Sequence, residues 1–490
     1  MTLLLRAARI PGRSAPVDVL VSGDRVTRVA SRIREPAARV VDLDGRFLRP
    51  GLWDSHVHFT QWVIARARVD LASASSAAET VDLVRRTLPG RTEEVVVGYG
   101  FRDGLWPDAP TRDALDAVAP RRPVVLVSGD LHCGWLNSAA ARLLGAALPA
   151  DGVLREAEWI GTLDRLDAQT QPRLEHYRDA AAAAAARGLV GIVEFENADN
   201  PRLWPERVAA GVTTLRVEAS VWPDRLEQVI ARGLRTGDRL EASGLATMGR
   251  LKIVADGSLN TRTAFCWDRY PDIPADHRHP FGIESVAPAE LERIVARAHA
   301  AGILPAVHAI GDRGNTEVID VFERLGIAGT IEHAQLVTTS DLARFGRLRL
   351  TASVQPEHAV DDRDVAGRHW RGRTDRAFAF RSLLDAGATL ALGSDAPVAP
   401  LDPWISIAAA VSRTRGGRPP WHPEQRLDVG DALAASSRGR RAVVAGEVAD
   451  LIVLESDPLA SGAADGATLR TFPVAATLLG GRFTHTTLEG

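Results

Sequence analysis

Lysine is almost absent from this chain. Lys and Arg together number 59 in 490 residues, and Lys252 is the only lysine among them. Arginine replaces lysine easily on a solvated surface, but not where the chemistry needs a compact amine that can lose its proton. The apolar neighbours Leu251, Ile253 and Val254 indicate a buried strand around this lysine. A buried amine must be paired, neutralised or chemically modified, and the strand alone is equally compatible with a structural ion pair.

Other scarcities exclude whole classes of protein. The two cysteines, Cys133 and Cys266, form no disulfide framework, so a reducing cytoplasm is the expected compartment. No stretch reaches the roughly 18 apolar residues of a membrane span, and the first apolar run is too short for a signal peptide. The net charge of -3 and the lack of a basic run argue against nucleic acid or an anionic membrane as partners.

Eight short apolar runs alternate with polar or helical stretches through the middle of the chain. They are "LRPGLWDSHVH", "LVGIVEFE", "TTLRVEAS", "RLKIVADGS", "ILPAVHAIGD", "GTIEHAQL", "RLTASVQPEH" and "ATLALGSDAP". Continuous apolar runs between helices are typical of parallel strands that are covered on both faces. Eight such units predict an α/β fold with a closed (β/α)₈ TIM-type barrel over residues 51–439, with its chemistry at the C-terminal ends of the strands.

Two further regions interrupt or flank the predicted barrel. About 130 residues separate His58 from Leu189, which is far more than one crossover needs, so a large insertion over residues 60–185 is expected after the first barrel strand. Both chain ends show alternating strand patterns broken by Gly and Asp turns. They predict a small composite β-sandwich made of residues 1–50 and 440–490.

Candidate metal ligands stand at five of the eight predicted strand ends. Residues i and i+2 of a strand face the same side, so His56 and His58 can reach one ion. The other candidates end the fourth, fifth, sixth and eighth runs: Lys252, His308, His333 and Asp395. A single histidine is more often a hydrogen-bonded core residue. The order of these side chains along successive strand ends is what favours a metal centre.

These motifs resemble those of the amidohydrolase superfamily, and within it the amidohydrolase-3 branch that includes N-substituted formamide deformylase. The matching stretches include "PGLWDSHVHF", "GDLHCGWLNSAA", "VHAIGDRG", "IEHAQL", "SVQPEH" and "PPWHPEQRL". The most specific matches are "KIVADGSLNTRTA" and "GSDAPV", whereas the HxH pair is shared much more widely. The resemblance covers nearly the whole chain.

The resemblance implies a centre of two divalent ions, with zinc as the first expectation and manganese, iron, nickel or cobalt as substitutes. It implies that CO₂ adds to Lys252 and that the resulting carbamate bridges the ions. A neutral amine can attack CO₂ and a guanidinium cannot, which would explain the retained lysine. The remaining ligands divide between a more buried ion, held by His56, His58 and Asp395, and a more exposed ion, held by His308 and His333.

The expected reaction is hydrolysis of a non-peptide C–N bond, in a linear amide such as an N-substituted formamide. A metal-activated hydroxide would attack the carbonyl, and Asp395 would serve as general base and then general acid. The resemblance implies that His132 polarises the carbonyl or the intermediate. The candidates for contact with the small-molecule substrate are Trp135, Asn137, Gln335, Gln355 and His358. Trp135 could equally be insertion core, and the two glutamines could instead hold metal ligands.

Four carboxylates leave alternatives open. Asp54 and Asp312 could orient the histidines or cap helices. Glu194 and Glu196 could face the pocket or pair with arginines.

Two other functions compete with this interpretation. A cyclic amide, a carbamate or an ester could be hydrolysed at the same centre. A metal-binding or regulatory protein that has lost catalysis is disfavoured, because all six ligand positions are filled and Asp395 is not Asn. A homodimer is expected only on the general frequency of such assemblies.

Overall fold

The computed structural model describes residues 2–91, 93–101, 103, 106–128, 133–271, 273, 274, 276–460 and 466–488. Contacts divide the chain into two compact units. The larger unit contains residues 1–59 and 178–490, and the smaller contains residues 60–177. Among the described residues, no helix is both long enough and apolar enough to cross a bilayer.

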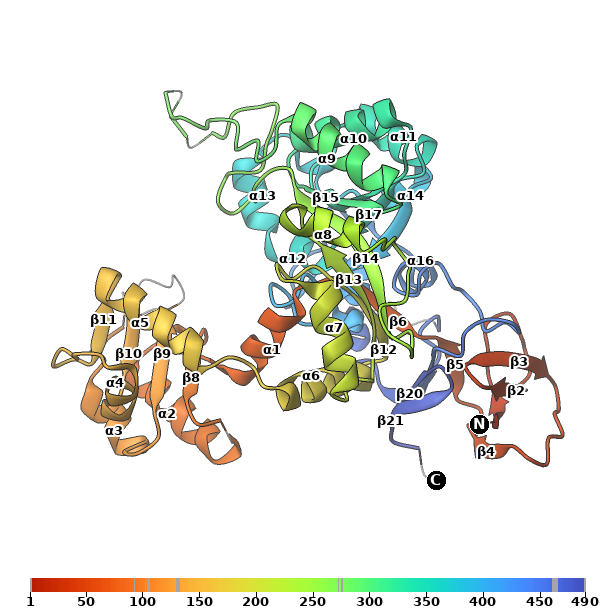
Figure 1. Cartoon of the computed structure of the whole chain (residues 1–490), viewed down its shortest axis with the longest axis horizontal. Helices are drawn as coiled ribbons and strands as arrows, with labels where there is room; N and C mark the ends of the chain where they lie inside the picture. The colour runs from red at the N-terminus through yellow and green to blue at the C-terminus, as the bar shows by residue number, and fades with distance from the viewer. Residues whose placement is uncertain are drawn as a thin grey trace. The chain divides into compact units, whose positions relative to one another are not determined.

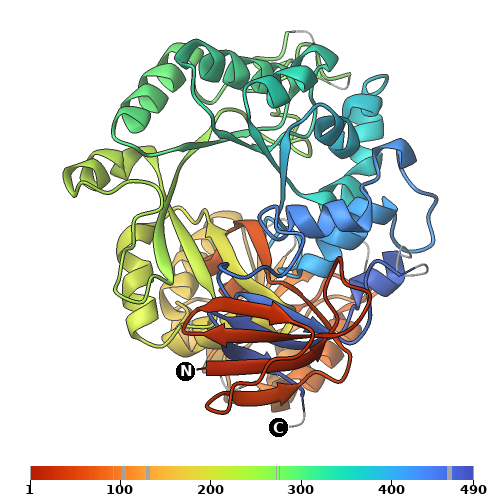
Figure 2. The same cartoon turned by 90° about the vertical axis from the view of Figure 1, so that its right-hand side faces the viewer.

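Eight parallel strands of the larger unit form the predicted barrel (Figures 1 and 2). They pair in sequence order: β6 (Leu52–Val57), β12 (Leu189–Glu194), β13 (Arg216–Val221), β14 (Ala246–Val254), β15 (Pro305–Ala309), β16 (Thr330–His333), β17 (Thr351–Val354) and β18 (Thr389–Leu392). Every residue of β12 is buried, as expected for a parallel strand that is covered on both faces. The (β/α)₈ prediction is therefore confirmed.

Helices follow most of these strands and pack apolar side chains against the barrel. Those of the larger unit are α7 (Asn200–Ala209), α8 (Leu226–Ala231), α9 (Pro288–Ala300), α10 (Asp312–Leu325), α11 (Thr339–Arg347), α12 (Pro356–Asp361), α13 (Arg363–His369), α14 (Phe380–Asp385), α15 (Pro403–Ser412), α16 (Val429–Ala435) and α17 (Gly466–Arg470). In α10 the buried stripe includes Val318, Ile319 and Phe322. This helix ends at Gly326, whose left-handed φ of 63° suits a residue without a side chain.

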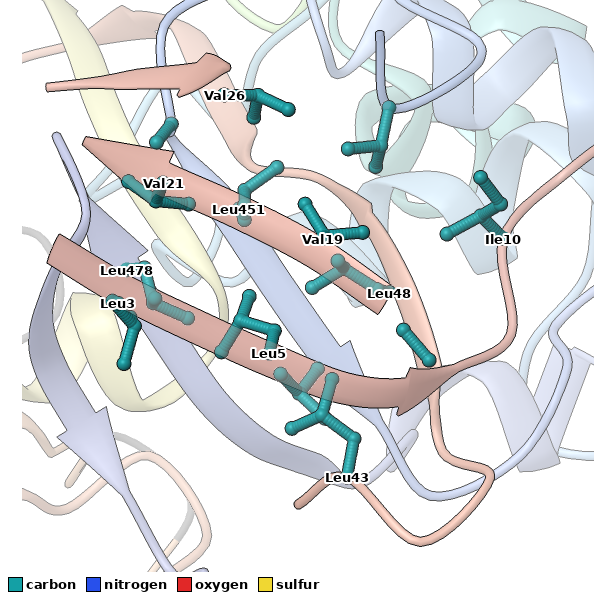
Figure 3. Packing of buried hydrophobic residues seen from close by; sticks show 14 of the residues in the cluster. Leu3, Leu5, Ile10, Val19, Val21, Val26, Leu43, Leu48, Leu451 and Leu478 are labelled. Atoms are coloured by element: carbon teal, nitrogen blue, oxygen red, sulfur yellow. The ribbon is translucent and has the colours of Figure 1, made fainter. Parts of the chain in front are cut away.

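The two ends of the chain form one sandwich of two four-stranded sheets, as predicted. The first sheet contains β1 (Thr2–Ala8), β2 (Val17–Ser22), β3 (Arg25–Ala30) and β4 (Arg39–Asp42); the second contains β5 (Phe47–Pro50), β19 (Leu451–Leu454), β20 (Val474–Leu479) and β21 (Arg482–Thr486). Figure 3 shows the shared core, where Leu5 and Val19 from the first sheet lie near Leu48, Leu451 and Leu478 from the second. Neither chain end could bury its apolar face alone.

The smaller unit has its own five-stranded sheet. Its strands are β7 (Val69–Asp70), β8 (Val96–Phe101), β9 (Val124–Ser128), β10 (Cys133–Leu136) and β11 (Val153–Arg155), and its helices are α2 (Ala77–Thr87), α3 (Arg112–Val118), α4 (Ser138–Leu144) and α5 (Glu156–Gln169). Trp135 belongs to one hydrophobic cluster and Trp159 to another. Helices α1 (Phe59–Ala67) and α6 (Leu174–Ala186) cross the boundaries between the two units.

Replacing Leu451 by alanine should destabilise the larger unit. Leu451 is fully buried in the sandwich core, and a Leu→Ala change in a packed core costs about 2–5 kcal/mol in the free energy of unfolding. The same change at Leu459, which is 47% exposed, should cost far less. Guanidinium denaturation followed by circular dichroism compares the two variants, and equal losses would contradict the shared core.

Candidate metal centre

The C-terminal ends of the barrel strands bring the six predicted ligands close together. In β6 and β14, His56 Nε2 lies 3.3 Å from the Lys252 Nζ. In β15 and β16, the rings of His308 and His333 have centroids 4.5 Å apart, and the His333 ring lies 4.8 Å from that of His56. His58 and Asp395 follow β6 and β18. Residues separated by hundreds of positions therefore form one cluster.

Three of these side chains fit the coordination of a single cation. His56 Nε2 and His58 Nε2 lie 3.5 Å and 3.4 Å from Asp395 Oδ1. Donors about 2.0–2.1 Å from a tetrahedral ion are themselves about 3.3 Å apart, so the observed spacing suits metal ligands. The side chains of His58 and Asp395 keep 23% and 13% of their surface exposed, which leaves the cluster open to solvent on that side.

Hydrogen bonds on the far side of two rings decide which nitrogen faces the cluster. His56 Nδ1 lies 2.7 Å from Glu332 Oε2, and His333 Nδ1 lies 2.8 Å from Gln355 Oε1. An amide oxygen only accepts a hydrogen bond, and the Glu332 carboxylate does the same in its ionised form, so in that form each Nδ1 carries the hydrogen. The Nε2 lone pairs of both rings are then directed toward the cluster, which is the arrangement of metal-binding imidazoles.

His308 has the opposite arrangement. Its Nε2 lies 3.1 Å from the carbonyl oxygen of Gly257, so Nε2 donates there and the Nδ1 lone pair is free. Asp256 Oδ1 lies 3.5 Å from the same Nε2. The Asp256 carboxylate also accepts hydrogen bonds from the backbone N–H groups of Ile310, Gly311 and Phe265. It therefore ties the loop after β14 to the loop after β15.

Burial disfavours the charged forms of three imidazoles in the cluster. It lowers the pKa of His56 and of His333 well below the ordinary value, with nearby Lys252 adding to the effect, and lowers the pKa of His308 to about 4. Burial also lowers the pKa of Lys252, against the opposing influence of Glu332 and Asp395. Neutral imidazoles have a lone pair for a cation, and a neutral amine has one for an electrophile.

Asp395 behaves differently from the other buried carboxyls. Burial alone would raise its pKa, but hydrogen bonding with His58 and the proximity of His333 and His358 hold the pKa of Asp395 below its usual value. The backbones of Asp395 and His333 are left-handed, with φ of 58° and 75°. Such strain costs about 1–3 kcal/mol per residue and often marks functional sites.

Two side chains that support the centre were absent from the sequence-based set. Glu332 precedes His333 in β16, and burial raises the pKa of its carboxyl to about 7. Asp256 follows β14, and burial likewise raises its pKa to about 7. The only local signals are a charged residue inside the apolar runs "TIEH" and "IVADG". Nothing in the sequence shows that Glu332 reaches His56.

The structure gives hydrogen-bond partners for three of the four carboxylates whose roles the sequence leaves open. Asp54 accepts hydrogen bonds from the backbone N–H groups of His56 and Ser394, so it fixes the backbone at this junction. Asp312 lies at the start of α10 and accepts a hydrogen bond from the Trp267 N–H.

Glu194 accepts hydrogen bonds from the Phe59 N–H, the Glu196 N–H and the indole N–H of Trp204. Its oxygens thus hold two backbone N–H groups and a tryptophan ring.

Three of the predicted substrate contacts lie beside the cluster. Gln335 Nε2 is 3.4 Å from His358 Nδ1, and His358 Nε2 is 3.9 Å from Asp395 Oδ2. Gln355 bonds to the His333 ring and to the Ser353 carbonyl, so it holds a candidate ligand.

The remaining predicted contacts belong to the smaller unit. Trp135 is fully buried, and its indole N–H donates to the Thr111 carbonyl, in agreement with the core alternative. Asn137 accepts from the Val124 and Ala140 N–H groups and caps α4. Its amide N–H groups donate to two further carbonyls, so all of its capacity is used inside this unit. His132 lies outside the described residues.

Comparison with known proteins identifies the family. The model of the Amidohydrolase family matches residues 39–485, so this chain belongs to that family. It is 28% identical to Protein LONG AFTER FAR-RED 3 of Arabidopsis thaliana, over 85% of this chain and 79% of the relative. It is 27% identical to the putative amidohydrolase YtcJ of Bacillus subtilis (strain 168), over 94% and 92%. It is also 27% identical to N-substituted formamide deformylase of Arthrobacter pascens, over 90% of both chains.

Solved structures agree with this assignment. An uncharacterized metal-dependent hydrolase from Pyrococcus furiosus superposes with a TM-score of 0.76 at 25% identity, covering 94% of this chain and all of that one. A second, from Pyrococcus horikoshii OT3, has a TM-score of 0.75 at 26% identity and covers 94% and 98%. The protein is a metal-dependent amidohydrolase, a hydrolase that acts on carbon–nitrogen bonds.

Replacing Glu332 by glutamine should weaken metal binding. The change removes the charge that holds the His56 ring, and loss of such a partner typically lowers metal affinity 10–100-fold. Competition with a chromophoric chelator measures the dissociation constant for Zn²⁺. Glu290→Gln on the exposed face of α9 is the matched control and should leave the constant unchanged. Equal affinity in both variants would show that Glu332 has no such role.

Proposed function

We propose that this protein hydrolyses a linear amide, such as an N-substituted formamide, at a centre of two divalent cations. The observation that carries the proposal is the convergence of His56, His58, Lys252, His308, His333 and Asp395 at the strand ends. The choice of an amide is supported by the name of the Arthrobacter relative and by its similar length. Zinc is the first choice because the donors are nitrogen and oxygen atoms.

The ligands divide into two sets. His56, His58 and Asp395 would hold one cation, and His308 and His333 the other, with Lys252 between them. When bound, the cations would polarise the substrate carbonyl and lower the pKa of a water molecule.

Lys252 would serve as a carbamate. The Nζ lone pair forms a bond to the carbon of CO₂, and the nitrogen loses one proton to solvent, which leaves a carboxylate at the end of the side chain. Arginine cannot replace lysine in this reaction because its guanidinium keeps its proton. Lys252 is only 2% exposed, so the new negative charge needs nearby cations to offset its desolvation.

Asp395 would transfer a proton from the attacking water to the departing amine. Its carboxyl stays ionised because its pKa lies below the usual value, and its Oδ1 lies beside the imidazoles of His56 and His58. From there it can accept a proton from the attacking water and return it to the departing amine nitrogen. His132 remains the proposed group for polarising the carbonyl.

Gln335 is proposed to contact the substrate. Its Oε1 is buried and has no hydrogen-bond partner in the described part of the chain. In either orientation of the amide, one of its two polar atoms faces His358 and the other is left for a substrate group, since an unpaired buried polar atom costs about 1–3 kcal/mol.

Cyclic amides, carbamates and esters are the alternative substrates. The same side chains would serve each of them, so the products must separate them. A cytoplasmic location and a homodimer also remain predictions.

Metal content and a substrate panel test this function together. Protein purified without chelator or nickel should contain about two divalent ions per chain by plasma mass spectrometry, and should release formate from N-substituted formamides. Lys252→Met, which preserves side-chain volume, should lose at least one ion and lower kcat/KM at least about 100-fold. One ion in both proteins would exclude a bridging lysine. Cleavage of a lactam or an ester but of no linear amide would replace the proposed substrate.

The carbamate can be observed directly because Lys252 is the only lysine. Protein equilibrated with ¹³C-labelled bicarbonate and Zn²⁺ should show one slowly exchanging carbamate resonance by NMR. Lys252→Arg is the control. It retains the positive charge of the side chain and the α-amino group of the chain, and it should lack this resonance. Identical spectra would mean that Lys252 is not carboxylated.

A further inference from the structure

The carboxylate of Asp395 lies between two different groups of histidines. Its Oδ1 faces His56 Nε2 at 3.5 Å and His58 Nε2 at 3.4 Å. Its other oxygen, Oδ2, lies 3.9 Å from His358 Nε2. His333, His358 and Asp395 each offer a ligand atom within 4.8 Å of the other two. The carboxylate therefore has one oxygen near each of two candidate cation positions.

His358 has an unexplained nitrogen at the second position. Its Nε2 is buried and has no hydrogen-bond partner among the residues that the structure describes, and the residue is only 7% exposed. The ring stacks with that of His333, with centroids 6.3 Å apart and planes at 10°. Burial of a polar atom without a partner is costly, so a ligand for Nε2 is expected.

The distance between His358 and Asp395 permits a shared cation. Two donors about 2.1 Å from one ion cannot be more than about 4.2 Å apart. The 3.9 Å between His358 Nε2 and Asp395 Oδ2 falls within that limit. It is too long for a hydrogen bond, so direct pairing does not satisfy either atom.

A glutamine stands behind each of the two stacked rings. Gln355 Oε1 accepts from His333 Nδ1 at 2.8 Å, which frees the His333 Nε2. The Gln335 amide lies 3.4 Å from His358 Nδ1 and leaves its Oε1 without a partner in the described structure. Half a turn of this amide places Oε1 against the Nδ1–H of His358 and frees the Nε2 lone pair. Both rings then have the same outer-sphere support.

We propose that His358, His333 and Asp395 form a subsite for a divalent cation, next to the Oδ2 atom of Asp395. His358 is then a metal ligand that no barrel strand supplies, since it lies in α12 after the end of β17. The proposal rests on the metal dependence of the proposed function. It adds a ligand to the second cation and assigns Asp395 as a carboxylate that contacts both ions.

Anomalous diffraction from crystals of the parent protein loaded with Zn²⁺ tests the subsite without any substitution. The expected result is an ion within about 2.0–2.3 Å of His358 Nε2 and in contact with His333 and Asp395. Bound ions with none on His358 overturn the subsite but leave the proposed function intact. Protein that binds no metal at all overturns both.

Titration of variants gives a second measure. His358→Ala should weaken the second Zn²⁺ at least about 100-fold and leave about one tightly bound ion. His299→Ala, on the exposed end of α9, is the matched control and should retain two. Two tight ions in His358→Ala would refute the assignment.

Gln335 supplies a sharper pair of variants. Gln335→Glu keeps an acceptor behind Nδ1 and should retain the second ion, whereas Gln335→Leu should weaken it about 10–100-fold. Equal Zn²⁺ binding by the two variants would contradict the role given to the amide.

Discussion

The closure of the barrel between its first and last strands is the constraint on which the metal centre depends. The Asp395 N–H donates to the His56 carbonyl at 2.8 Å, and the His58 N–H donates to the Ala396 carbonyl at 2.9 Å. Asp54 reinforces this junction from β6 by accepting from the Ser394 N–H. A Cβ on Gly393 would lie 2.7 Å from the His56 nitrogen, so only glycine permits this approach. Three of the six ligands are placed by these few backbone contacts.

The closed barrel also determines the electrostatics of the site. Its interior holds several carboxyls and one amine out of water, and burial raises the pKa of Asp54, Asp256 and Glu332 to about 7. Burial acts in the opposite direction on Lys252 and the imidazoles, which favours their neutral forms. Uncompensated negative charge in such a site is unfavourable, and divalent cations are the natural compensation. Desolvation of these carboxylates is unfavourable without a cation, so it favours metal binding.

Behind three of the ligand rings lie hydrogen-bond acceptors, which leave the opposite ring nitrogen with a lone pair for a cation. Glu332 and Gln355 fix two rings by Nδ1, and the Gly257 carbonyl fixes a third by Nε2. These partners come from different strands and loops, so the lone pairs converge only in the folded barrel. Family membership defines the reaction class, whereas the substrate depends on side chains around this layer.

The sequence by itself determined the eight-stranded barrel, the composite sandwich and the convergence of the six candidate ligands. Burial on both faces of a parallel strand leaves a continuous apolar run in the sequence, which predicts the strands. Barrel geometry places the C-terminal ends of all eight strands on one rim, which predicts that the ligands meet there. Only the tertiary structure showed that Glu332 supports His56, which lies 276 positions away in the sequence, and that His308 presents its Nδ1 to the cluster. It also showed that Trp135 and Asn137 belong to the core of the smaller unit. It also placed His358 Nε2 at 3.9 Å from Asp395 Oδ2. Such contacts depend on strand stagger and side-chain direction across the closed sheet, which no pattern along a single strand encodes.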